Sequence, residues 1–240
     1  MIDKTLKDYK SLYLCVSGGA DSALGLYTIA KYITENKLDT KVTVVTAVEP
    51  QPHYCRNDKN AKKVLSVIQD IFPTFKIDKH IIHFLEGYNR RIDGMPQEFP
   101  KYKLVKQWHN DNWKKGDYDL GISFVSSFPR VEDMNEPLYK KSLTIGPEDR
   151  SYTGKRNDKI RPGHSRGGAW WEPFLNLTKE DLADLYSKYD LMYNLFPYTA
   201  SCTGDSKHTD NFTKPCQKCF WCLEKYWAFG LFDLPQAYKL

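Results

Sequence analysis

Long hydrophobic runs and export signals are missing from this sequence. In 240 residues, no stretch approaches the roughly 20 consecutive apolar residues that a membrane-spanning helix needs. The first residues, MIDKTLKDYKSLYL, lack the basic region, apolar core and small-residue cleavage site of a signal peptide. From these two absences we expect a cytoplasmic protein.

Neither sign of charge dominates, and internal repeats and low-complexity tracts are also missing. The chain has 35 Lys and Arg against 30 Asp and Glu, a formal charge of +5 that is spread along the sequence. This balance favours anionic ligands slightly and does not indicate a nucleic-acid-binding tail. The length fits one large domain, or one domain with an appended module.

Cysteine is scarce, and its distribution is uneven. Four of the six cysteines lie between residues 202 and 222. Without an export signal, clustered cysteines in a chain of this length bind a metal or act chemically more often than they form disulfides.

Hydrophobic periodicity predicts alternating strands and helices. Four apolar or β-branched runs predict strands: Leu12 to Val16, Val42 to Val48, His80 to Phe84 and Leu120 to Val125. Apolar residues at helical spacing follow the first two strands, and a further helix is expected around Phe99 to Trp113. This alternation predicts an α/β fold, with an open, mainly parallel twisted sheet and helices on both faces.

The pattern breaks between residues 129 and 170 and then resumes. Charges, prolines and glycines dominate that segment, which we interpret as an irregular insertion. Thr178, followed three residues later by Asp181, predicts the start of a helix. We therefore expect an α/β domain over residues 1–200, which contains this insertion, and a C-terminal segment over residues 201–240 packed on it.

The sequence SGGADS, residues 17 to 22, lies where the first strand passes into the first helix. It lacks the lysine of the common phosphate loop and the third glycine of the dinucleotide fingerprint. Gly18 and Gly19 would still let the backbone approach an anion closely, and the two serines would add hydroxyl donors at a helix N-terminus. Asp21 would repel a bare phosphate, so it indicates either a bridging cation or a helix-capping role. A plain glycine turn with an N-cap is the alternative to a phosphate site.

The late cysteines have the spacing of a metal site. Cys202, Cys216, Cys219 and Cys222 form the pattern C-x13-C-x2-C-x2-C. Short C-x2-C segments bring successive sulfurs to one point, and a distant fourth ligand completes a tetrahedral zinc site, which is normally structural when all four ligands are thiolates. Free or disulfide-paired cysteines, or His208 in place of one thiolate, are the alternatives. Cys15 and Cys55 are interpreted as a buried residue and a loop residue.

Together these segments resemble the PP-loop ATP pyrophosphatases, in particular the 7-cyano-7-deazaguanine synthases. The resemblance rests on SGGADS, EPFLNLTKEDLADLYSKYDL, TASCTG and CQKCFWCLEKY in that order, and so covers most of the chain. It implies the adenine nucleotide alpha hydrolase-like fold. Lys179 matches the lysine of the family's late segment, and Thr199, Ser201 and Cys202 match the turn that supplies its first zinc ligand. An exposed place in the first turn of a helix is the alternative for Lys179.

The resemblance implies an ATP-dependent ligase-type enzyme that uses ATP, Mg²⁺ and Zn²⁺. A substrate oxygen would attack the α-phosphorus of ATP, pyrophosphate would leave, and ammonia would attack the adenylated carbon. The nearest reaction converts 7-carboxy-7-deazaguanine to the amide and nitrile in queuosine biosynthesis. Asp21 and Lys179 are the expected catalytic residues, and the expected nucleotide-binding residues are Ser17, Gly18, Gly19, Ala20, Asp21 and Ser22.

Two segments associated with the substrate in that family are not matched. VEPQPHYCRNDKN and VSSFPRVEDMNEP stand in their places, so the substrate, a deazapurine or another carboxylate, stays open. Sulfur transfer to tRNA or a metabolite, with Cys55 or Cys202 as the active thiol, is a second hypothesis. A nucleotide-binding module without turnover is a third. Homo-oligomerisation is left open, and a nucleic-acid partner is not favoured.

Overall fold

The computed structural model describes residues 4–48, 56–84, 118–127, 158–162, 169–204 and 206–239. Its strands are β1 (Ser11–Cys15), β2 (Lys41–Val48), β3 (Lys79–Phe84), β4 (Leu120–Ser123), β5 (Arg161–Pro162) and β6 (Ala169–Trp171). Its α-helices are α1 (Ala20–Glu35), α2 (Asn57–Ile71), α5 (Lys179–Lys188), α6 (Leu191–Asn194) and α7 (Phe220–Phe229). Short 3-10 helices are η1 (Lys4–Asp8), η3 (Phe196–Tyr198) and η4 (Pro235–Ala237).

The strands form one sheet in the order β3-β2-β1-β4-β6-β5. The first five in this order run parallel, and β5 pairs antiparallel with β6. Strand β1 is central: Leu12 is in register with Val42 of β2 on one side and with Leu120 of β4 on the other. The predicted α/β fold with a mainly parallel sheet is confirmed.

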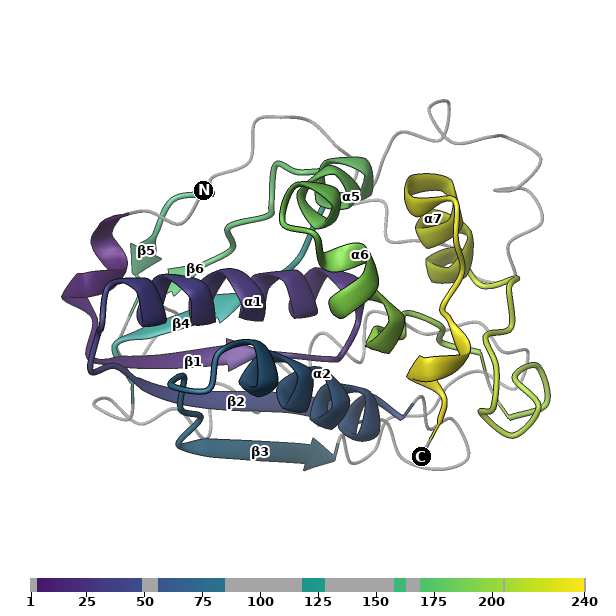
Figure 1. Ribbon diagram of the computed structural model, residues 1–240, viewed down its shortest axis with the longest axis horizontal. Helices are drawn as coiled ribbons and strands as arrows, with labels where there is room; N and C mark the ends of the chain where they lie inside the picture. Colours follow the sequence, from purple (N-terminus) through teal and green to yellow (C-terminus); the bar gives the residue numbers. More distant parts are fainter. Residues whose placement is uncertain are drawn as a thin grey trace.

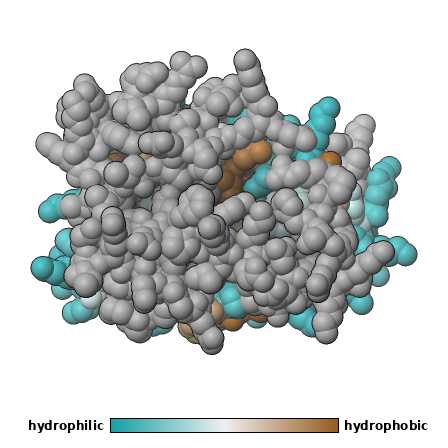
Figure 2. All heavy atoms as spheres, turned by 180° about the vertical axis from the view of Figure 1, so that it is seen from behind, coloured by the Kyte–Doolittle hydropathy of each residue, from teal (hydrophilic) through white to brown (hydrophobic). Residues whose placement is uncertain are grey.

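Helices α1 and α2 lie side by side across one face of the sheet (Figure 1). Helix α1 lies in the crossover from β1 to β2, and α2 lies in the crossover from β2 to β3. Both crossovers run in the same direction along the sheet, and right-handed crossovers of this kind place their helices on the same face. The helix expected at 99–113, which would belong to the other face, lies outside the described residues. On that opposite face, hydrophobic side chains are visible near the middle and hydrophilic ones mainly at the sides (Figure 2).

The core lies between this sheet and its helices. Leu14 of β1, Val44 of β2 and Ile122 of β4 are fully buried against apolar residues of α1 such as Leu24 and Ile29. Leu12 to Val16 is a continuous apolar run because β1 is buried within the sheet, as expected for a central parallel strand.

The end of the segment expected to be irregular contains part of the sheet. Ala169, Trp170 and Trp171 form β6, which pairs with β4. Three residues are too short for a strand to show alternation in sequence. Among the described helices, none has the length and hydropathy to cross a membrane.

Candidate functional site

The SGGADS loop lies at the carboxyl end of the central strand. The sheet order changes direction here, because β2 follows β1 on one side whereas β4 lies on the other. In open parallel sheets, ligands bind outside the carboxyl ends of the strands at such a point. The loop therefore occupies the position in the fold where a nucleotide site is expected.

Gly18 is required by the shape of the loop. Its φ of +82° is in the left-handed region, and a Cβ there would collide with the backbone of Asn60 and Ala61 at the start of α2. The carbonyl of Gly18 accepts a hydrogen bond from the backbone N–H of Ala200 at 3.0 Å. The loop is thus held tightly between α2 and the segment that leads to Cys202.

The helix that follows starts without a side-chain cap. Gly19 is the N-cap of α1 and no side chain accepts a hydrogen bond as a cap, so Asp21 does not cap the helix. The Ser22 hydroxyl donates to the carbonyl of Gly19 at 3.1 Å and accepts from the N–H of Ser17 at 3.2 Å. Ser17 is exposed and Gly19 half-buried, so the positive end of the helix dipole faces an accessible part of the loop.

Asp21 is the centre of a polar cluster drawn from four parts of the chain. It forms an ion pair with Lys179 of α5, and its other oxygen accepts from the hydroxyl of Ser126 at 2.6 Å. Lys179 also lies 3.2 Å from the carboxylate of Glu224 in α7. The cluster of Asp21, Ser126, Lys179 and Glu224 joins the loop, the segment that follows β4, and helices α5 and α7.

Lys179 is buried, not exposed on the first turn of its helix. Its side chain is 5% exposed. Burial acts to lower the pKa of Lys179, but attraction to Asp21 and Glu224 outweighs burial, and the pKa is raised. The ammonium is therefore charged, and it pairs with both carboxylates.

Helix α5 presents Lys179 by way of a complete capping box. The Thr178 hydroxyl accepts from the N–H of Asp181, and the Asp181 carboxylate accepts from the N–H of Thr178. The hydroxyl of Tyr186 donates to the carbonyl of Ala20 at 2.8 Å and so joins the helix to the start of α1. The helix start predicted from Thr178 and Asp181 is confirmed.

The four late cysteines converge. The Sγ atoms of Cys202, Cys216, Cys219 and Cys222 all lie within 4.8 Å of one another. Four sulfurs around one zinc ion at about 2.3 Å would be roughly 3.8 Å apart, so small shifts suffice. A four-iron cluster binds each thiolate on a different iron and separates the sulfurs more widely. The geometry fits a single tetrahedral ion better.

Backbone N–H groups point at these sulfurs. Gly204 and Cys216 donate to Cys202 Sγ at 3.3 and 3.2 Å, and Cys219 donates to Cys216 Sγ at 3.3 Å. Hydrogen bonds among the four side chains lower the pKa of Cys216 and Cys219 and raise the pKa of Cys202 and Cys222. The backbone N–H groups that donate to Cys202 Sγ and Cys216 Sγ favour the thiolate, the form that binds metal.

A buried ion pair fixes the turn that carries Cys202. Asp233 accepts from the backbone N–H groups of Ser201 and Cys202 at 2.9 and 3.0 Å. Lys225 of α7 donates to Asp233 at 2.6 Å and to the hydroxyl of Thr199 at 2.8 Å. Sequence reasoning identified the turn but missed Lys225, Asp233 and Glu224, because the residues that they connect to, such as Thr199, Ser201 and Lys179, are distant along the chain.

Of the other two cysteines, Cys15 does not join the cluster. Burial raises the pKa of Cys15 to about 12, which keeps this thiol neutral at physiological pH. Cys15 was expected to be buried and is half-buried. Cys55 lies outside the described residues. Residue 205, which follows Gly204, lies outside them as well.

A scan of the chain against protein-family models finds no match, and a search of curated proteins finds none either. Among solved structures, the chain is similar to the U34-tRNA thiolase NcsA from Methanococcus maripaludis with its [4Fe-4S] cluster, at 10% identity and a TM-score of 0.42. It is also similar to NAD⁺ synthetase from Burkholderia pseudomallei, at 12% identity and a TM-score of 0.35. Each similarity covers 76% of this chain, which spans 58% and 60% of the lengths of those two chains. Both TM-scores lie below 0.5, so the architecture rests on the strand order and register above.

Proposed function

We propose that this chain is a PP-loop ATP pyrophosphatase that adenylates a small-molecule substrate and releases pyrophosphate. The observation that carries the proposal is the position of SGGADS at the carboxyl end of β1, with Asp21 tied to Lys179 and Ser126. A plain glycine turn has no need of a buried lysine from a distant helix. The cluster accounts for the sequence better as a reaction site.

In this reaction an oxygen of the substrate attacks the α-phosphorus of ATP. The bond between the α-phosphorus and the bridging oxygen breaks, and pyrophosphate leaves with the bonding electrons. The backbone N–H groups at the start of α1 and the dipole of that helix stabilise the negative charge that develops on the leaving group. Lys179 contributes a positive charge beside the same turn.

The loop favours a nucleotide accompanied by a divalent cation. The carboxylate of Asp21 would repel a bare polyphosphate. Asp21 supplies the carboxylate oxygens that Mg²⁺ prefers, and Mg²⁺ when bound would neutralise charge on the pyrophosphate. Zn²⁺ fits the four cysteines and has a structural role, because four thiolates leave no open position for chemistry.

The nearest substrate chemistry is that of the 7-cyano-7-deazaguanine synthases, in which a carboxylate is adenylated and ammonia then attacks the carbon. The order of the matched segments supports this branch. Sulfur transfer through Cys202 is disfavoured, because its sulfur lies inside the cluster and accepts two backbone hydrogen bonds. We propose a cytoplasmic location, since the reducing cytosol would keep the free cysteines available for metal.

The test is to incubate the purified protein with ATP, Mg²⁺, ammonium and 7-carboxy-7-deazaguanine and to identify products by mass spectrometry. We expect AMP, pyrophosphate and a 7-amido or 7-cyano product. AMP without such a product would support the adenylation reaction and exclude this substrate. No AMP with any carboxylate acceptor would favour a binding module without turnover.

Asp21→Asn tests the assignment within the loop. The amide keeps an oxygen that can accept from Ser126 but loses the charge, so we expect AMP formation to fall by about 100-fold or more. The matched control is Asp184→Asn, on the exposed surface of α5, which should leave the rate unchanged. Retained pyrophosphate release by Asp21→Asn would contradict the role of this carboxylate.

A further inference from the structure

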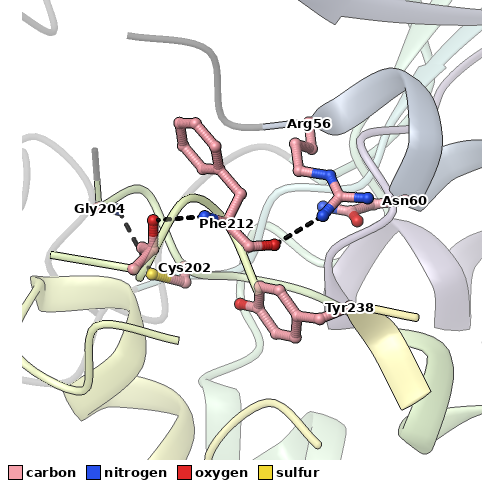
Figure 3. A pocket seen from close by; sticks show the side chains of 7 residues that line it. Arg56, Asn60, Cys202, Gly204, Phe212 and Tyr238 are labelled. Carbon is pink, nitrogen blue, oxygen red and sulfur yellow. Dashed lines mark hydrogen bonds between the residues drawn. The ribbon is translucent and has the colours of Figure 1, made fainter. Parts of the chain in front are cut away.

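The small pocket between α2 and the cysteine cluster is not a place for a substrate. It is lined by residues that include Arg56, Asn60, Cys202 and Tyr238 (Figure 3), and its volume is about 10 Å³. A volume of this size holds about one water molecule. A side chain that acts on a ligand as large as a nucleotide therefore lies elsewhere, and the polar cluster around Asp21 contains one that the proposed reaction does not yet use.

That residue is Glu224, one of two carboxylates that pair with Lys179. The ammonium of Lys179 forms an ion pair with Asp21 of the loop and lies 3.2 Å from the carboxylate of Glu224. The side chain of Asp21 is 17% exposed, that of Lys179 5% and that of Glu224 1%. Exposure thus falls from Asp21 to Glu224, and a ligand that enters at the loop meets Asp21 first.

Glu224 is held by a helix that is itself fixed at several points. It lies on α7, two residues after the metal ligand Cys222, and it is fully buried. Helix α7 packs on α5 through an edge-to-face contact of Phe229 with Tyr186, whose ring centroids are 5.4 Å apart. Glu224 is therefore a carboxylate at a fixed place beside Lys179, out of reach of a ligand at the loop.

Asp21 cannot serve Lys179 and a divalent cation equally well. Both of its oxygens have partners, since one pairs with Lys179 and the other accepts from the hydroxyl of Ser126 at 2.6 Å. A cation bound by Asp21 weakens the pair with Lys179, because it takes up the negative charge of the carboxylate and repels the ammonium. A buried ammonium that loses its counter-charge is costly. With Glu224 present, Lys179 keeps one carboxylate throughout.

We propose that Glu224 is a positioning residue, which holds Lys179 in place and compensates its charge while Asp21 binds the cation that accompanies the nucleotide. The identity of the ligand as a nucleotide with Mg²⁺ rests on the proposed function. The role of Glu224 concerns binding of this ligand and not the rate of the chemical step. The competing explanation is that Glu224 only ties α5 to α7.

The experiment measures binding of α,β-methylene-ATP, which cannot be cleaved between its α and β phosphates, by titration calorimetry at a series of Mg²⁺ concentrations. Glu224→Gln keeps the size of the side chain and removes its charge. We expect this variant to need about tenfold more Mg²⁺ for half-maximal binding, because Asp21 is then the carboxylate on which Lys179 depends. Glu180→Gln, exposed in the first turn of α5, is the matched control and should behave like the wild type.

Lys179→Met separates the two explanations. It removes the ammonium that competes with the cation for Asp21, so adding Glu224→Gln to Lys179→Met should leave the Mg²⁺ requirement unchanged. If the rise persists in this background, Glu224 acts through the packing of α5 on α7 and the proposal is overturned.

Glu224→Asp provides the measurement if the glutamine variant does not fold. It keeps the charge but moves it away from Lys179, so the Mg²⁺ requirement should rise in the same direction and by less. A Mg²⁺ requirement equal to that of the wild type, in whichever of the two variants folds, would overturn the proposal.

These results are distinct from those of the ATP assay. If the analogue binds and Glu224→Gln raises the Mg²⁺ requirement, but the wild type forms no AMP from ATP, the reaction is excluded and the role of Glu224 is supported. AMP formation by the wild type with an unchanged Mg²⁺ requirement in Glu224→Gln would support the reaction and overturn the role of Glu224. Failure of the wild type to bind the analogue would overturn both.

Discussion

Two buried lysines on the C-terminal helices respond differently to their surroundings. Burial lowers the pKa of Lys225 and outweighs the attraction of Asp233, whereas the pKa of Lys179 is raised because two carboxylates overcome its burial. Lys225 thus depends on a single carboxylate, which also accepts from Ser201 and Cys202. Asp233 is the residue through which α7 holds the first metal ligand.

Asp233→Asn should be strongly destabilising. The amide has the size of the carboxylate but leaves Lys225 as an uncompensated buried charge, and breaking such a pair costs about 3–5 kcal/mol. The free energy of unfolding in urea should fall by about that amount, and the affinity for metal should fall with it. Asp210→Asn is the control: its pair with Lys214 is exposed, so the change should be about 0.5 kcal/mol or less. Equal losses in both variants would contradict the role of Asp233.

Single residues were predictable where chemistry and spacing coincide. The serine and glycine loop and the four cysteines are recognisable because each set is local or regularly spaced. Glu224 and Lys225 are neighbours in α7. Nothing in the local sequence indicates that Glu224 contacts Lys179 or that Lys225 contacts Asp233.

Helix α5 is the element that brings Lys179 to the loop, and its start is defined by the capping box of Thr178 and Asp181. Removing the hydroxyl exposes unsatisfied N–H groups in the first turn. We expect Thr178→Ala to lower the free energy of unfolding by about 1 kcal/mol. AMP formation at low temperature should remain near the wild-type rate, since Lys179 is still held by two carboxylates. Urea unfolding together with the AMP assay checks both expectations.

Thr213→Ala is the matched control for this helix start. The Thr213 hydroxyl is exposed and donates to the carbonyl of Asp210 within a turn, so the effect should be about 0.5 kcal/mol or less. A large loss of AMP formation in Thr178→Ala, without loss of stability, would mean that the cap itself takes part in the reaction.

At the scale of elements, long periodic segments were predictable and short ones were not. The strand predicted at 42–48 begins one residue earlier, at Lys41, and the strand at 80–84 begins at Lys79. Strand β6 has three residues and is recognisable only through its pairing with β4. Its place in the sheet is decided by tertiary contacts rather than by the sequence of the strand.

In the whole molecule, the cysteine cluster and the loop are mechanically connected. Ala200 donates to Gly18, Cys202 follows two residues later, and Asp233 fixes the turn between them. The bound ion would therefore hold not only the C-terminal segment but also one wall of the nucleotide site. The division that we propose, into residues 1–200 and residues 201–240, separates the nucleotide site from the metal site. The two parts share this wall.

Cys219→Ser should therefore affect metal, stability and activity together. Serine is a poor ligand for zinc, so we expect elemental analysis to find one zinc per wild-type chain and much less in the variant, with a lower melting temperature and slower AMP formation. Treatment of the wild type with a chelator should reproduce all three effects, and readdition of zinc should reverse them. Cys15→Ala, outside the cluster, should keep the metal.

Unchanged zinc in Cys219→Ser would show that the ligand set is wrong, and iron in the wild type would identify an iron–sulfur cluster. Loss of zinc with full AMP formation would instead separate the two sites, and the shared wall at Ala200 would have no role in the reaction.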